Sequence, residues 1–143
     1  MAYDPLYIRF LYHFLIDRDY FECHEAMEEL WLEEGRNPLY QGLLQVAVGL
    51  YHHRNGNRSG AEKLLAAALD KLAGYPDRTL GIDLDRLRFD AAHYLQRLRG
   101  FEKAPFLCHD LDIAILDPGL QEQLSLYQQT MQDAEKEGSE LDD

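Results

Sequence analysis

The chain has 143 residues, of which 46% are hydrophobic and 28% are charged, a composition typical of one globular domain and not of a disordered segment. Its 26 acidic residues outnumber its 14 basic residues and give a net charge of −12. A surface of that sign repels phosphate, so the composition argues against a general nucleic-acid binder and against a protein that binds membranes through a basic surface.

Much of the negative charge lies at the C-terminus, where residues 133–143 hold six acids and one lysine. We expect residues 1–132 to form a helical bundle domain and residues 133–143 to be an acidic, disordered tail. The first residues lack the basic and apolar regions of a signal peptide, and the longest uncharged run, residues 37–53, is too short and too polar to span a bilayer. Cys23 and Cys108 form no C-x-x-C pair, which favours reduced thiols. We therefore expect a soluble cytoplasmic protein.

Helical periodicity dominates the first part of the chain. The pair Asp4-Pro5 predicts the start of a first helix that ends near residue 17. A second helix is expected over residues 20–34, where Gly35 stops it, and a third over residues 39–53.

The second part of the chain continues the helical pattern. The capping-box pattern Ser59-x-x-Glu62 predicts the start of a fourth helix, and a fifth is expected over residues 83–99. Residues 100–118 contain two prolines and predict an extended segment that wraps over the bundle, followed by a last helix over residues 119–132. The arginines of the fifth helix, which are interleaved with acids, are expected to form a solvated face. No pair of strands with a hairpin turn is predicted, so the fold class is all-α: a single-domain bundle of about five to six helices, in which the second and third form a central antiparallel hairpin.

Polar residues form a stripe on each of these two central helices. Helical spacing places His24 and Glu28 on one face of the second helix, and folding the short connection sets Glu28 opposite Gln45 of the third. Gly42 and Gly49 are expected to leave room for a neighbouring helix or for a bulky group such as a tryptophan or an imidazole. The predicted binding or structural polar cluster consists of His24, Glu28, Trp31, Gln41, Gln45 and His52.

Three interpretations of this cluster remain open. In the first, it is a buried hydrogen-bonded network that fixes helix register, in which Gln45 binds Glu28 and His52 caps the end. In the second, it is a small binding or catalytic pocket, where Glu28 or Glu25 acts as general base with His24 in the hydrolysis of a small substrate. In the third, His24, Glu28 and His52 (or His53) bind a metal ion, because His24-Glu25-x-x-Glu28 is similar to a zinc-binding signature; otherwise no cofactor is expected.

Two modes of association are also considered. A groove of the helix hairpin is a candidate docking site for a protein partner. The first helix carries more apolar residues than one buried face requires, which suggests a homodimer through Tyr3, Tyr7, Phe10, Leu11, Phe14 and Leu15.

The two central helices also carry a recognisable pattern. It reads Phe21-x-x-His24-Glu25-x-x-Glu28-x-x-Trp31, then Gln41-Gly42-Leu43-x-Gln45-x-Ala47, His52, and Gly56-Asn57-x-x-Gly60-Ala61. This pattern resembles domain-of-unknown-function family three-hundred-and-nine, small helical proteins of bacteria, archaea and plastids, over about residues 6–100. The resemblance implies an all-helical single domain and supplies no activity.

Overall fold

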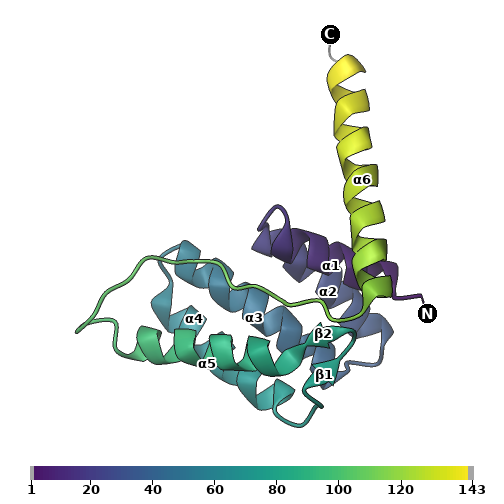
Figure 1. Ribbon diagram of the computed structural model, residues 1–143. Coiled ribbons are helices and arrows are strands. Elements are labelled where there is room, and N and C mark those ends of the chain that lie inside the picture. The colour runs from purple at the N-terminus through teal and green to yellow at the C-terminus, as the bar shows by residue number, and fades with distance from the viewer. Residues whose placement is uncertain (1, 142–143) are drawn as a thin grey trace.

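The computed structural model describes residues 2–141 of the chain. Within this range there are six α-helices and one two-stranded sheet, so the predicted all-α class is confirmed (Figure 1). The elements in chain order are α1 (Pro5–Leu15), α2 (Tyr20–Glu33), α3 (Pro38–Arg54), α4 (Arg58–Leu72), β1 (Arg78–Thr79), β2 (Ile82–Asp83), α5 (Leu84–Arg99) and α6 (Pro118–Leu141).

Side-chain caps define where the helices begin. The Asp4 carboxylate accepts a hydrogen bond from the Leu6 backbone N–H at 2.9 Å, which confirms the predicted start of α1. The predicted capping box of α4 is wrong, because Asn57 is the cap and accepts from the Gly60 N–H at 2.9 Å. Glu62 lies instead 3.5 Å from Arg99 of α5.

Helices α1 to α5 pack in chain order, each against the next, and α3 lies between α2 and α4. The close approach of α3 and α4 explains the two glycines of α3. A Cβ atom on Gly42 would lie 2.7 Å from Leu72 of α4, and one on Gly49 would lie 3.0 Å from Leu65. The glycines therefore admit a neighbouring helix, and the expectation that they make room for Trp31 or His24 is wrong.

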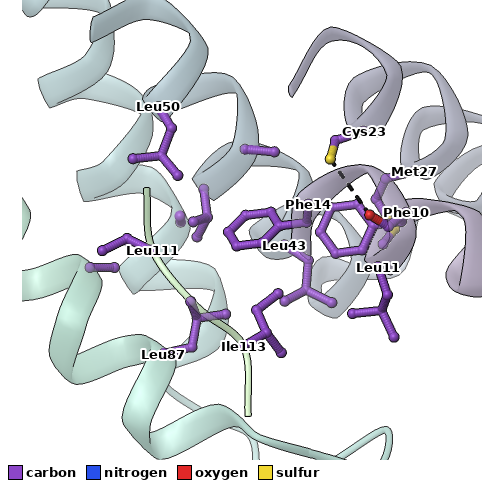
Figure 2. Packing of buried hydrophobic residues seen from close by; sticks show 14 of the residues in the cluster. Phe10, Leu11, Phe14, Cys23, Met27, Leu43, Leu50, Leu87, Leu111 and Ile113 are labelled. Atoms are coloured by element: carbon purple, nitrogen blue, oxygen red, sulfur yellow. Dashed lines mark hydrogen bonds between the residues drawn. The ribbon is translucent and has the colours of Figure 1, made fainter. Parts of the chain in front are cut away.

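Residues 100–117 run without helix back along α5 to the start of α6, as predicted (Figure 1). Leu111 and Ile113 of this segment are buried and point into the same core as Leu43 of α3 and Leu87 of α5 (Figure 2). Polar contacts anchor it as well: the Tyr20 hydroxyl donates to Asp110 at 2.5 Å, and Arg54 donates to the same carboxylate at 3.1 Å. The segment is thus an integral part of the core.

The small sheet was not predicted. β1 and β2 pair antiparallel across a turn at Leu80 and Gly81, whose φ angles are +54° and +75°. A Cβ atom at Gly81 would lie 2.6 Å from the Tyr3 hydroxyl and 3.0 Å from Leu120, so the backbone angle and the limited space both favour glycine there. Strands of two residues carry too little alternation to be seen in the sequence.

Helix α6 accounts for the apolar excess on α1. Leu120 and Leu124 are buried, and the ring of Tyr127 packs edge-on against Tyr12 of α1 at a centroid distance of 5.2 Å. The side chains suggested as a dimer surface are largely enclosed within the chain itself, since Phe10 and Phe14 have no exposed area (Figure 2). The first helix therefore does not offer them to a second copy.

Helix α6 continues past the predicted end near residue 132 and runs to Leu141. Its C-terminal part projects from the bundle (Figure 1). Its side chains at 132–138 are exposed. The tail expected to be disordered is thus helical to Leu141, while residues 142–143 lie outside the described residues. None of the helices in the described range is long and apolar enough to cross a membrane.

Candidate functional site

The predicted polar stripes meet on one side of the α2–α3 pair. The other side of α2 is buried through residues such as Cys23 and Met27, and the glycine side of α3 is covered by α4. The stripe residues are left partly exposed on the remaining side, which we call the α2–α3 face. It consists of Phe21, His24, Glu28, Trp31, Gln41, Gln45, Val48, Tyr51 and His52.

His24 lies between two carboxylates of its own helix. Its Nε2 atom is 3.1 Å from Glu28 Oε2, and its Nδ1 atom is 3.7 Å from Glu25 Oε1. The side chains are 37%, 45% and 51% exposed for His24, Glu28 and Glu25. Pairs with this much solvent contact contribute little to stability, about 0.3–0.5 kcal/mol for an i, i+4 helix pair.

The buried hydrogen-bonded network that we expected does not form. Among the described residues no hydrogen bond joins Gln45 to Glu28, and Gln45 Oε1 and Trp31 Nε1 are both buried without a hydrogen-bond partner. His52 is instead turned toward the α3–α4 turn, where the Asn57 side-chain amide donates to its Nδ1 at 3.4 Å. The cluster residues share a face, but they are not linked to one another beyond His24 and its two glutamates.

A groove opens at one end of the α2–α3 face, between the start of α2 and the end of α3. Its volume is about 310 Å³. Phe21 and Tyr51 stand at its edges with 50% and 36% of their area exposed and a ring-centroid distance of 6.3 Å. The lining residues are Tyr20, Phe21, His24, Val48, Tyr51 and His52.

This groove combines His24 and His52, as the sequence predicted, with residues that the sequence analysis left out. Tyr51 is the main omission, although its spacing of three from Val48 extends the stripe on α3. Glu28, Trp31, Gln41 and Gln45 belong to the face but do not line the groove.

A metal centre requires several His, Cys, Asp or Glu side chains close enough together to bind one ion. Among residues 2–141, no three or more His, Cys, Asp or Glu side chains are grouped so that they could hold a metal ion. The set considered from the sequence, His24, Glu28 and His52, is therefore not brought together in that way.

The family resemblance inferred from residues of α2 and α3 has a counterpart among known proteins. Residues 7–64 match the family model described as Domain of unknown function (DUF309). The predicted resemblance is confirmed. The match includes both helices of the α2–α3 face and ends within α4, short of the residue 100 to which we expected the resemblance to extend.

Two curated relatives are similar to this chain. Uncharacterized protein YpuF of Bacillus subtilis (strain 168) is 42% identical over 90 residues, which are 59% of this chain and 52% of the relative. An uncharacterized protein of Aquifex aeolicus (strain VF5) is 35% identical over 86 residues, which are 57% of this chain and 24% of that protein. The chain thus spans about half the length of the first relative and about a quarter of the second. No solved structure matches the chain.

Proposed function

We propose that the chain is a binding module whose α2–α3 face receives a segment of another protein, one that carries an apolar side chain next to a basic one. The observation that carries the proposal is the groove beside His24, which is open to solvent and flanked by the exposed rings of Phe21 and Tyr51. Polar and aromatic groups that are only half buried suit recognition better than they suit a structural core.

The size of the groove supports a side chain as its occupant. A volume of about 310 Å³ is at the lower end of the range for small-molecule pockets. Covering the rings of Phe21 and Tyr51 with an apolar side chain stabilises a complex by roughly 25 cal/mol for each Å² removed from water. A leucine, methionine or phenylalanine of a partner segment fits this description.

Charge supports a basic residue beside that apolar one. Apart from His24, all the charged residues of α2 are acidic, and α3 carries no Asp, Glu, Lys or Arg before Arg54. Glu25 and Glu28 lie beside the groove on either side of the imidazole. A lysine or arginine of the partner is attracted to these carboxylates, and this attraction weakens with salt.

Hydrolysis by His24, Glu25 and Glu28 receives less support from the geometry. A glutamate that serves as general base needs a carboxylate oxygen directed toward the nucleophile from which it takes the proton. Here Glu28 Oε2 and Glu25 Oε1 each face a ring nitrogen of His24 instead. We further propose that binding takes place in the cytoplasm, which is supported by the two unpaired thiols of Cys23 and Cys108.

A displayed library of random peptides tests the proposal. We expect enrichment of peptides that pair an apolar residue with Lys or Arg, and we expect Phe21→Ala and Tyr51→Ala each to weaken an enriched peptide about tenfold or more, equivalent to about 1.4 kcal/mol. Phe89→Ala is the matched control, because Phe89 is 70% exposed on α5, outside the face. Glu28→Gln should reduce the salt dependence of binding. Equal affinity of the Phe21→Ala, Tyr51→Ala and Phe89→Ala variants, or no enrichment at all, would refute the proposal.

A further inference from the structure

The end of the molecule farthest from α6 has a charge opposite to that of the whole chain. It is built from residues 53–62, at the α3–α4 turn, and residues 97–109, at the end of α5 and the start of the segment that follows (Figure 1). We call these two stretches the arginine end. They hold five basic residues, Arg54, Arg58, Arg97, Arg99 and Lys103, and two acidic ones, Glu62 and Glu102, whereas the rest of the chain has nine basic and 24 acidic residues.

Two of these arginines have no carboxylate partner in the part of the chain that the structure describes. The guanidinium of Arg58 stacks on the ring of Phe101 at 4.0 Å, and that of Arg97 stacks on Phe106 at 4.0 Å. Stacking holds each guanidinium plane in place. Arg97 Nη1 donates to His109 Nε2 at 3.3 Å, and its remaining N–H groups are available to a carboxylate. By contrast, Arg99 already lies 3.5 Å from Glu62, and Arg54 is paired with Asp110, the residue after the second stretch, at 3.1 Å.

Arg58 lines two cavities. Two hollows of about 510 Å³ each share Arg58 and Phe101 among their lining residues. One of them also contains Phe106 and Leu107, and Leu107 is 89% exposed. Burial, and then the charges of His109 and Arg58, lower the pKa of His53, which lines the same hollow. The other hollow also contains Arg99, Glu62 and Glu102. The arginine end therefore combines apolar area with donors for carboxylates.

Within this chain, α6 carries the complementary charge. From residue 133 onward the helix has Asp133, Glu135, Glu137 and Glu140 against the single basic residue Lys136. This part of α6 projects from the bundle on the side away from the arginine end, so it does not reach that end of its own molecule (Figure 1).

We propose that the acidic C-terminal part of α6 docks onto the arginine end of a second copy of the chain, with its carboxylates on Arg58 and Arg97. The contact is head-to-tail, because two different surfaces meet. Repetition of such a contact gives a ring or an open string of copies and not a two-fold dimer. Neither Arg58 nor Arg97 lines the groove beside His24, so this proposal does not rest on the proposed binding of a partner segment.

Sedimentation velocity of the full chain tests this proposal. We expect the mean mass to rise with protein concentration at about 0.01 M salt and to return to that of a monomer at about 1 M salt, where the screening length is about 3 Å. The double variant Arg58→Glu/Arg97→Glu and the double variant Asp133→Lys/Glu137→Lys should each be monomeric at low salt. Arg86→Glu is the control, because Arg86 is an exposed arginine on α5 outside the arginine end, and it should leave assembly unchanged.

Mixing an arginine-end variant with an acidic-helix variant gives the sharper result. The charge-neutral versions Arg58→Gln/Arg97→Gln and Asp133→Asn/Glu137→Gln are used, because the two charge-reversed surfaces would attract each other. The first retains the acidic helix and the second retains the arginine end, so only one interface can form, and we expect a one-to-one complex that grows no further. The Arg58→Glu substitution places an acidic side chain in the first turn of α4, where it interacts favourably with the helix dipole, so we expect the helix to tolerate it. If the charge reversal nevertheless unfolds the protein, Arg58→Gln/Arg97→Gln serves as the second arginine-end variant. A wild-type protein that stays monomeric at low salt at every concentration overturns the proposal, even if a synthetic peptide of residues 131–143 binds it. Assembly that survives both double variants overturns it as well.

Discussion

Substitution of Gly42 by alanine probes the contact between α3 and α4 directly. A methyl group there would lie 2.7 Å from both Cγ and Cδ2 of Leu72 and 3.2 Å from Cβ of Lys71. Leu72 is completely buried, so its side chain has no open space into which to move. The methyl group is therefore accommodated only by separating the two helices or by forcing Leu72 from its rotamer.

Two opposing effects determine the size of the change. Alanine is favoured over glycine inside a helix by about 1 kcal/mol. Overpacking a close contact costs about 1–3 kcal/mol, and the 2.7 Å distances at Gly42 indicate the upper end of that range. We expect Gly42→Ala to lower the free energy of unfolding by about 2 kcal/mol, or the melting temperature by about 6–8 °C.

Two other glycines provide matched controls. A methyl group at Gly49 would be 3.0 Å from Leu65 Cγ, so the two effects nearly cancel and the stability should change by less than about 1 kcal/mol. Gly74 has nothing within 4 Å, and alanine there should be neutral or slightly stabilising. Urea denaturation followed by circular dichroism at 222 nm measures all three. If Gly42→Ala were as stable as Gly74→Ala, the reasoning that these glycines exist for α3–α4 packing would be refuted.

Two further predictions concern histidines. Burial, and then the charges of His109 and Arg58, lower the pKa of His53, so the unfolded chain binds a proton more readily than the folded one. The contribution of neutral His53 to the free energy of unfolding should therefore be fully present above the ordinary His pKa of about 6.5 and should decline as the pH falls through that value. Urea denaturation between pH 8 and pH 5 should show a shallower decline for His53→Gln than for the wild type, and equal slopes would contradict the assignment. Glu28→Ala should change the free energy of unfolding by less than about 0.5 kcal/mol, since the contact of Glu28 with His24 is half exposed. A loss of about 2 kcal/mol or more would contradict this and would favour the interpretation of the cluster as a buried hydrogen-bonded network.

For the polar stripe, helical periodicity predicts which side chains share a helix face but not whether that face is buried. Spacings of three and four residues correctly place His24 beside Glu28, because the i, i+4 relation is a property of the helix itself. Whether that face is buried depends on which helix covers it, and α4 covers the glycine side of α3 instead. Of the three interpretations that the sequence left open, the sealed cluster rested on the apolar residues around the stripe, and the structure leaves His24 and Glu28 partly open to solvent.

The arginine end illustrates the same limit. Interleaved acids suggested that the arginines of the fifth helix are solvated, and Arg86 does pair with Asp90 at 3.1 Å. Arg97 behaves differently because Phe106, from the segment after the helix, folds back to stack on it. Such a contact joins residues from different elements, and no local pattern encodes it.

The sequence by itself determined the helical class, the positions of most helix starts and the extended path of residues 100–117, because caps, prolines and 3.6-residue periodicity act locally. It also marked α2 and α3 as the helices that carry the candidate site. Only the tertiary structure decided which faces are covered: α1 by α6, the glycines of α3 by α4, and the stripe of His24 and Glu28 by nothing within the described residues. The net charge of −12 likewise concealed an arginine end, because a sum over residues has no position and only folding gathers like charges at one place.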